Sequence, residues 1–380
     1  MLYELPRPTD TDRRVLDDID TRRDALQHAV QRVPTTWTRG LRRQLTASAI
    51  AASNTIEGYS VPVESVGDLM DGEREGVRTS EENKAETLAH QQAMTYIRSL
   101  HDAADFRYEK SLLNGLHFIL QGHHHPHPPS GRWRTGPVRV TAPGDPMATD
   151  YQTPDADLVP DLIGELVDWL NSGDLDTHHL LRAAMAHFNL VKIHPWNDGN
   201  GRMSRSLQTL VLARSSVLAP EFASIEEWLG MPEHTWAYYA ALKQVGGPVY
   251  SPGRDLRPWI ELNLRAYHEQ TQRVQHRVDR SNTAWQNLED LAGQLGLRER
   301  QITALHDAVL TRRVRRLRYE HSENLTTQQA GRDLTDLTTR GLLTAHGQTK
   351  GRYYTPGPNL PAPLIEAART PYTITNPYQA

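Results

Sequence analysis

The chain is organised around HPWNDGNGRMSR, the stretch from His194 to Arg205. Apolar residues at helical spacing precede it, and a second apolar pattern begins at Leu207. We therefore expect a loop between two buried helices, with the last residues of the stretch opening the second helix. Gly199 and Gly201 permit a tight turn that points backbone N–H groups inward, and the helix N-terminus adds donors and partial positive charge. These features predict an anion site suited to phosphate.

The side chains of this stretch supply the roles that phosphate transfer requires. Asp198 can hold a divalent cation together with phosphate oxygens and water. Arg202 and Arg205 lie three residues apart, so they share a helix face and can bind one polyphosphate. The imidazole of His194 can accept a hydroxyl proton near neutral pH. A structural histidine beside an ordinary glycine-rich loop is the alternative, but one short segment that supplies every role favours the chemical interpretation.

This stretch resembles the signature of the Fic family, H-x-F-x-[D/E]-G-N-G-R-x-x-R. Every fixed position matches except Trp196, which stands where the family usually has Phe, and both are large aromatics that can anchor the loop. The resemblance implies a mainly α fold, with a helical Fic core and a β-hairpin flap. It also implies transfer of AMP from ATP to a hydroxyl of a protein target, with magnesium and release of pyrophosphate.

The resemblance also assigns these roles residue by residue. His194 would be the catalytic base, and Asp198 would be the magnesium ligand. The nucleotide-binding residues would be Gly199, Asn200 and Gly201 at the α-phosphate, and Arg202 and Arg205 at the β- and γ-phosphates.

A second stretch, SAIAASNTIEG at residues 48–58, predicts an alanine-rich helix that ends at Gly58. Glu57 falls in its last turn, where the helix dipole disfavours a carboxylate, so it either has a cationic partner or faces solvent. The stretch resembles the Fic inhibitory motif, [S/T]-x-x-x-E-[G/N], with Ser53, Glu57 and Gly58 in place. The resemblance implies that Glu57 pairs with Arg205 and keeps the γ-phosphate of ATP from its productive position.

Composition restricts the class of protein. The 380 residues leave room for two or three domains, and 38% hydrophobic with 23% charged residues is typical of a soluble globular protein. Cysteine is absent, which excludes disulfides and cysteine-ligated zinc and fits a reducing compartment. No apolar run approaches the ~20 residues of a membrane helix, and the N-terminus lacks a signal-peptide core. We expect a cytoplasmic protein with no membrane partner, and the arginine-rich, lysine-poor composition indicates a bacterial source.

We expect four regions along the chain. Residues 1–100 would form N-terminal helices that include the inhibitory helix, and residues 101–280 would form the Fic catalytic core. Residues 281–356 would form a winged-helix-like α+β domain. The proline-rich residues 357–380 lack periodicity and would form a loose tail.

Local patterns predict individual elements. Residues 59–79 are polar and contain glycine, which is typical of loops. Thr79-Ser80-Glu81-Glu82 then offers a capping box that opens a helix through about residue 101. Residues 131–140 predict a β-hairpin that resembles the Fic flap, which lays the target backbone beside the catalytic loop by strand addition. Further helices are expected at 257–280, 286–296 and 299–310.

Four histidines crowd the proline-rich loop at His123, His124, His125 and His127. Such a cluster can bind a transition metal. It lacks helical spacing and has no neighbouring carboxylate or cysteine to complete a ligand set. The sequence therefore favours a flexible loop over a metal site.

The C-terminal region differs in pattern and in charge. A helix at residues 325–337 with Thr326 as its cap, followed by two short strands around a polar turn, resembles a winged helix. From Arg298 to Arg352, eleven lysines and arginines stand against six aspartates and glutamates, so this segment carries +5 while the whole chain carries −4. Such segregation predicts DNA contact, with a protein-docking module as the alternative. The densest basic run is Arg312, Arg313, Arg315, Arg316 and Arg318.

Three functions remain open at this point. The first is AMP transfer to a Ser, Thr or Tyr hydroxyl of a protein target, the chain itself included, with autoinhibition by Glu57. The second is removal of AMP at the same site, with Glu57 positioning water. The third is DNA-binding regulation by a chain whose Fic core is inactive. The sequence names neither the target nor the oligomeric state, and a homodimer is among the alternatives.

Overall fold

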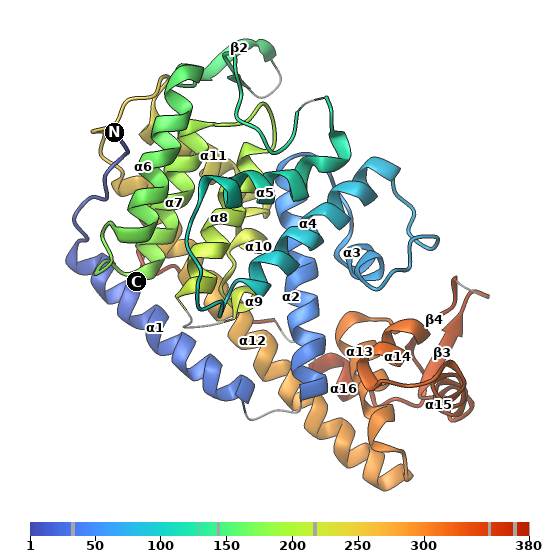
Figure 1. Ribbon diagram of the computed structural model, residues 1–380. Helices are drawn as coiled ribbons and strands as arrows, with labels where there is room; N and C mark the ends of the chain where they lie inside the picture. Colours follow the sequence, from blue (N-terminus) through green and yellow to red (C-terminus); the bar gives the residue numbers. More distant parts are fainter. Residues whose placement is uncertain are drawn as a thin grey trace.

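The computed structural model describes residues 1–31, 35–127, 129–142, 145–215, 219–348, 351–367 and 371–379. Within them the chain is mainly helical, and its strands pair as two short antiparallel hairpins. At the centre, α7 (His179–Ile193) packs along α8 (Asn200–Arg214), as Figure 1 shows. Both helices are buried on nearly every face, as expected for the two helices that flank the loop.

Other helices pack around this pair and extend away from it. Around it lie α2 (Thr35–Ile56), α4 (Glu81–Ser99), α5 (Lys110–Gln121), α6 (Val159–Ser172), α9 (Pro220–Ala223) and α12 (Arg257–Leu295). The other described helices before residue 257 are α1 (Asp10–Gln31), α3 (Val63–Met70), α10 (Glu226–Leu229) and α11 (Pro232–Gly246), with the 3-10 turns η1 (Gly122–His124) and η2 (Ala156–Leu158). After α12 come α13 (Glu299–Thr311), α14 (Arg316–Glu323), α15 (Thr327–Thr339), β3 (Leu343–His346), β4 (Tyr353–Pro356) and α16 (Ala362–Ala367).

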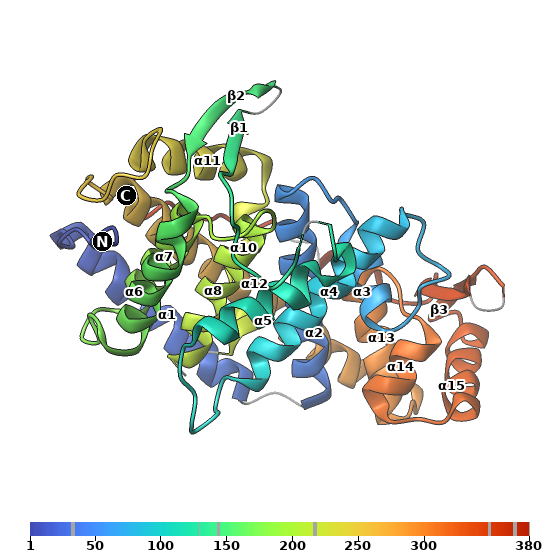
Figure 2. The same ribbon diagram turned by 45° about the horizontal axis from the view of Figure 1, so that its top comes forward.

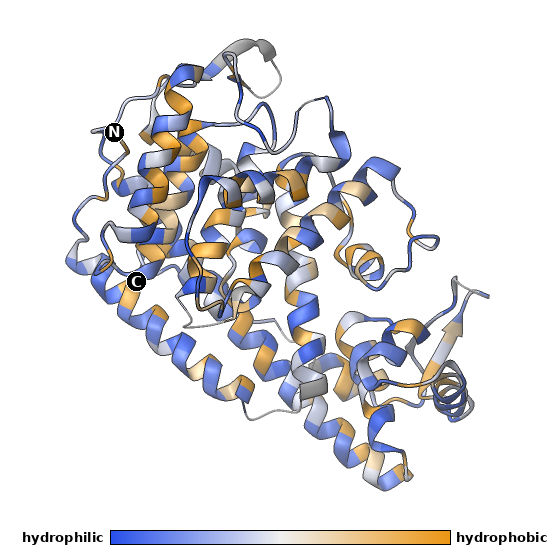
Figure 3. Cartoon of the chain, in the orientation of Figure 1, coloured by the Kyte–Doolittle hydropathy of each residue, from blue (hydrophilic) through white to orange (hydrophobic). Residues whose placement is uncertain are grey.

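Hydropathy follows this arrangement. Figure 3 shows hydrophobic residues concentrated along α6 and α7, whereas α1 carries many hydrophilic residues along its length. No helix in the described part of the chain is both long enough and apolar enough to cross a membrane.

Buried apolar side chains gather in two clusters within the described residues. The first surrounds α7 and α8, and the second lies between α13, α14, α15, the end of α12 and the start of α2. Helix α2 belongs to both, because Trp37 and Leu41 lie in the second cluster while Ile50 and Ile56 lie in the first. The apolar core of the C-terminal unit therefore includes side chains from outside residues 281–356, such as those at the start of α2.

Helix α12 is one continuous helix from Arg257 to Leu295, so the separate helices expected at 257–280 and 286–296 are wrong. Residues 281–292 contain neither glycine nor proline, so nothing in them ends a helix. The helix ends at Gly296, which adopts the left-handed φ of 63° common at helix ends. One helix thus joins the two clusters.

The segment 59–79 differs from the expected loop because it contains α3. Val66 and Leu69 of this short helix are buried against the rest of the chain, which accounts for helix formation in a polar segment. The next helix begins within the predicted segment 79–82. Its cap is Ser80, whose hydroxyl accepts a hydrogen bond from the backbone N–H of Asn83, and no capping box forms.

The β-hairpin is present but lies later than expected. Its strands are β1 (Arg139–Ala142) and β2 (Asp145–Gln152), paired in antiparallel register with Arg139 opposite Gln152. Of the predicted stretch 131–140, only the last two residues belong to a strand, because the earlier residues are held against the catalytic loop. Figure 2 shows the hairpin projecting from the helices.

The C-terminal unit has the expected order of a helix followed by two strands. Thr326 caps α15 and forms a capping box with Gln329, and β3 pairs with β4 in antiparallel register. Val314 adds an isolated antiparallel bridge to Tyr354. The name winged helix and the DNA contact remain predictions.

The expected loose tail is wrong for the residues that the structure describes. Leu360 and Leu364 are buried in the second cluster, and residues 362–367 form α16. Further on, Thr375 bonds to Gln272 of α12, and the Tyr378 hydroxyl donates to Asp12 of α1 at 2.7 Å. Buried leucines and these polar contacts hold the segment against the body of the protein.

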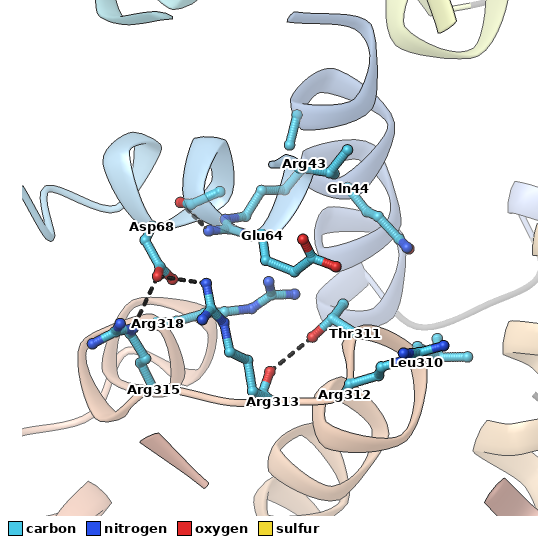
Figure 4. Close-up of a pocket in the computed structure, with 13 residues that line it drawn as sticks. Arg43, Gln44, Glu64, Asp68, Leu310, Thr311, Arg312, Arg313, Arg315 and Arg318 are labelled. Atoms are coloured by element: carbon cyan, nitrogen blue, oxygen red, sulfur yellow. Dashed lines mark hydrogen bonds and ion pairs between the residues drawn. The ribbon is translucent and has the colours of Figure 1, made fainter. Parts of the chain in front are cut away.

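The basic run of the C-terminal unit faces the protein rather than open solvent over most of its length. Figure 4 shows Arg313 and Arg315 directed at Asp68 of α3, at 2.7 and 3.1 Å. Arg318 donates two hydrogen bonds to Asp307 of α13. These pairs border a cavity of about 110 Å³ between α2, α3 and the turn from α13 to α14. The run therefore docks the C-terminal unit onto the N-terminal helices.

Candidate active site

The loop between α7 and α8 makes two left-handed turns. His194 ends α7 with φ 53° and Gly199 precedes α8 with φ 73°. A left-handed conformation costs a residue with a Cβ about 1–2 kcal/mol, so His194 must be held there by its surroundings. The turns place the first residues of α8 at the floor of the site, where early helical N–H groups have no intrahelical acceptor.

Arg134 holds the His194 turn from the segment before the hairpin. Its backbone N–H donates to the Pro195 carbonyl at 2.9 Å, and its Nε donates to the His194 carbonyl at 2.8 Å. Its Nη2 donates to the Pro154 carbonyl at 2.6 Å. This buried guanidinium thus joins the catalytic loop to both ends of the hairpin, a role that the sequence analysis missed.

The imidazole of His194 is held in one tautomer. Nδ1 lies 3.1 Å from the Val191 carbonyl, which can only accept, so Nδ1 carries the proton and Nε2 keeps its lone pair. Burial lowers the pKa of His194 to about 4. The ring is therefore neutral at pH 7 and able to accept a proton at Nε2.

Trp196 anchors the loop in the core. It is fully buried, stacks on His117 with centroids 4.5 Å apart, and donates from Nε1 to Asn114 of α5. The Asn200 side chain accepts from the backbone N–H of Trp196 and donates to its carbonyl. The side-chain amide of Asn200 thus closes the loop on itself, and its contact with a phosphate remains a prediction.

Asp198 lies exposed at the rim of the site. Its Oδ1 accepts from the Gly199 N–H at 2.7 Å, and its backbone carbonyl accepts from Nε2 of His117 at 3.0 Å. His117 was not singled out from the sequence, although it sets the position of this turn. An exposed carboxylate beside a phosphate site is a suitable ligand for magnesium, which takes few protein ligands and keeps its waters.

Arg205 is buried and bound to the end of α2 and the turn that follows it. Its Nε donates to the Ser53 hydroxyl at 2.8 Å, and its Nη2 donates to Oε1 of Glu57 at 2.7 Å. Burial alone would raise the pKa of Glu57, but Arg205 and Arg202 outweigh it and hold that pKa below its ordinary value. The Glu57–Arg205 pair implied by the resemblance is present, and Gly58 turns the chain away with φ 91°.

Arg202 is held by a residue that the sequence analysis missed. It pairs with Glu86 of α4, whose carboxylate is fully buried, and its guanidinium lies over the Tyr59 ring. Glu86 lies at helical spacing with His90 and Ile97 on the buried face of α4, which was the one available signal. Each arginine predicted to grip polyphosphate thus has its own carboxylate partner.

Comparison with known proteins places this site in a family. The model of the Fic/DOC family matches residues 89–212, which include the whole loop. Residues 89–212 of this chain therefore form a domain of the Fic/DOC family. The matched residues comprise most of α4 and extend through α8, and helix α2, which carries the predicted inhibitory motif, precedes them.

Curated relatives are named as Fic adenylyltransferases. "Protein adenylyltransferase Fic" of Nematostella vectensis is 27% identical over 212 residues, which cover 56% of this chain and 47% of the relative. The protein of the same name from Culex quinquefasciatus is 28% identical over 302 residues, 76% of this chain and 53% of the relative. The chain thus spans about half the length of these relatives.

Solved structures share the fold. A Fic family protein from Desulfovibrio desulfuricans G20 superposes with a TM-score of 0.57 at 20% identity, covering 94% of this chain and 99% of that chain. A fragment of Fic-1 from C. elegans gives a TM-score of 0.54 at 23% identity, with 69% and 71% covered. The Fic fold therefore extends well beyond residues 89–212.

Beside the Fic loop, the histidine cluster is more ordered than the expected flexible loop. His123 and His124 lie in η1, and their Nε2 atoms point to Glu86 of α4. Burial lowers the pKa of both rings. The carboxylate that the local sequence lacked is supplied from another helix.

Two adjacent tyrosines of α11, Tyr238 and Tyr239, lie in different surroundings. Tyr238 is buried and bonds to His187 of α7, so it serves packing. Tyr239 donates from its hydroxyl to the Ile56 carbonyl at 3.1 Å. Tyr239 thereby fixes the C-terminal turn of α2 next to Glu57.

Proposed function

We propose that this chain is an AMP transferase that uses ATP and magnesium to modify a Ser, Thr or Tyr hydroxyl of a protein, itself included. We also propose that Glu57 holds it in an inhibited state. The main support is the start of α8, where a neutral His194 and an Arg205 bound by Glu57 lie around one anion-binding turn. The adenylyltransferases from Nematostella vectensis and Culex quinquefasciatus are consistent with this chemistry.

In the proposed reaction, His194 acts on the incoming hydroxyl. Nε2 accepts the hydroxyl proton while the hydroxyl oxygen forms a bond to the α-phosphorus. The bond from the α-phosphorus to the bridging oxygen breaks, and pyrophosphate leaves with the electron pair. The first N–H groups of α8 would bind the α-phosphate oxygens. Asp198 would hold the magnesium ion, which neutralises phosphate charge when bound.

Inhibition would act through geometry. A guanidinium that is bound by a carboxylate is not free for a phosphate, so Glu57 would deprive the γ-phosphate of Arg205. ATP would then bind with its α-phosphate poorly aligned for attack. A misplacement of about 1 Å can cost ~10²-fold in rate, so the nucleotide need not be excluded for the enzyme to be slow.

Removal of AMP from a modified protein is the second candidate. Glu57 favours it because its carboxylate lies within the site, close against Gly201 at the start of α8. There it could position a water molecule for attack on the phosphodiester. The same residue would then inhibit the addition of AMP and assist its removal by hydrolysis.

Labelled ATP with magnesium distinguishes these functions. We expect Glu57→Gly to incorporate AMP into itself or into added protein up to ~10²-fold faster than wild type, because Arg205 is freed. The double variant Glu57→Gly/His194→Ala is the matched control and should incorporate none. Equal rates for wild type and Glu57→Gly would contradict inhibition, and loss of AMP removal in Glu57→Gly would instead favour the second candidate.

A further inference from the structure

Two imidazoles and one carboxylate converge beside the Fic loop. Nε2 of His124 lies 2.7 Å and Nε2 of His123 lies 3.2 Å from the same oxygen, Oε1 of Glu86. The three ligand atoms all lie within 4.8 Å of one another. The Glu86 side chain is fully buried, whereas the His123 and His124 side chains are 21% and 23% exposed, so the group is open to solvent on one side.

We infer that Glu86, His123 and His124 form a binding site for a transition-metal dication such as Zn²⁺. Zinc bonds of 2.0–2.1 Å in tetrahedral geometry place neighbouring donor atoms about 3.3 Å apart. The separation of Glu86 from His123 already has this value, and that of Glu86 from His124 needs to open by about 0.6 Å. Two imidazole nitrogens and one carboxylate oxygen, with a fourth position open, are a common zinc donor set.

The second oxygen of Glu86 supports this assignment. Oε2 is paired with Arg202, so Oε1 is held in place for the histidines. Metal-binding carboxylates are usually fixed by a hydrogen-bonding partner of this kind. The ion would therefore sit on the residue that also holds an arginine of α8.

A second group of two histidines and one carboxylate has one of its imidazole nitrogens occupied by another residue. Asp20, His178 and His179 also lie close together, with Nε2 of His178 2.9 Å from Asp20. Nε2 of His179, however, lies 3.1 Å from the Arg23 guanidinium, which can only donate. That nitrogen is occupied as an acceptor, so this group is not the better ligand set.

Calorimetric titration of Zn²⁺ into the tag-free full chain, stripped with a chelator, tests the inference. We expect His123→Ala/His124→Ala to bind one ion fewer than wild type, or to bind it more than about 100-fold more weakly, since even outer-shell changes cost ~10–100-fold. His125→Ala/His127→Ala, from the same loop, is the matched control and should bind as wild type does.

Thermal unfolding with and without Zn²⁺ provides the second readout. The ion should raise the Tm of wild type and of His125→Ala/His127→Ala, but not that of His123→Ala/His124→Ala. The Tm without zinc reports whether each variant folds. Equal zinc binding by all three proteins, or none by wild type, overturns the inference, and neither measurement depends on AMP transfer.

Discussion

In His194, the groups that hold the left-handed backbone are different from the imidazole that would carry out the chemistry. Its left-handed φ is imposed by the helix end and by Arg134, which binds the His194 carbonyl. The imidazole donates a hydrogen bond from Nδ1 to the Val191 carbonyl three residues before it. Because neighbours hold the turn, the side chain can be removed without undoing the loop.

His194→Ala should therefore remove transfer while leaving nucleotide binding. The expected loss in the Glu57→Gly background is ~10²–10⁴-fold, the usual cost of removing a general base. ATP affinity, measured by calorimetry, should stay near that of Glu57→Gly, because His194 acts on the hydroxyl and not on the phosphates. Residual transfer within about tenfold of Glu57→Gly would contradict the assignment of His194 as the base.

The residues of the loop could be predicted because they are adjacent in sequence and each has a recognisable chemical role. The residues that hold the loop in place could not be predicted in this way. Arg134 and His117 act through backbone contacts across 60 and 81 residues, and Glu86 meets Arg202 across 116. A buried arginine or histidine looks the same in the sequence as an exposed one, so only the folded chain identifies these contacts.

At the level of elements, long periodic helices are predicted better than short ones. The apolar spacing of α7 and α8 and the Thr326 cap of α15 predict those helices correctly. Helix α3 and strand β2 were missed, because eight residues each carry too little periodicity to outweigh polar and turn-forming composition. The burial of α3 and the pairing of β2 come from tertiary contacts.

Where α2 meets α8, there is no room for a side chain at Gly201. A Cβ built on this residue would collide with Oε1 of Glu57 and crowd the Arg205 guanidinium. Gly201→Ala should therefore lower the Tm of wild type or displace Glu57, despite the higher helix propensity of alanine.

In the Glu57→Gly background, the same substitution should be neutral or stabilising by up to ~1 kcal/mol, the helix propensity gain of Ala over Gly. Thermal unfolding of wild type, both single variants and the double variant gives the coupling energy between the two positions. Simple additivity would mean that Glu57 does not occupy the space next to Gly201 in solution.

At the scale of the whole molecule, the C-terminal unit is docked by buried charges. Arg313→Ala/Arg315→Ala leaves Asp68 buried without these two partners, which should cost about 3 kcal/mol, at the low end for broken buried pairs since Arg313 is partly exposed. Arg312→Ala/Arg316→Ala removes the same charge from exposed positions and should cost less than about 1 kcal/mol. Chemical denaturation compares the two, and equal losses would contradict the docking role.

Stability should also fall in mild acid. Burial lowers the pKa of His90 and His187 to about 3 and that of His306 to about 4. Each of these histidines binds a proton more readily in the unfolded chain than in the folded chain. Their contribution to the free energy of unfolding is therefore fully present above pH 6.5 and is lost as the pH falls toward the folded pKa values. Each histidine contributes ~1.4 kcal/mol per pH unit in this window. The Tm should decrease from pH 7 to pH 5, and a flat profile would show that these rings are not buried as neutral groups.

Helix α2 connects two distant parts of the molecule. Its start is embedded in the C-terminal unit through Trp37 and Leu41, and its other end presents Glu57 to Arg205. From Leu41 to Glu57 a helix rises about 24 Å, so a tilt of only ~3° about the embedded end would move the carboxylate by roughly 1 Å. Such a displacement is of the size that alters catalytic rates by ~10²-fold. If Glu57 inhibits transfer as proposed, a ligand that rotates the C-terminal unit and α2 by a few degrees would therefore change the catalytic rate.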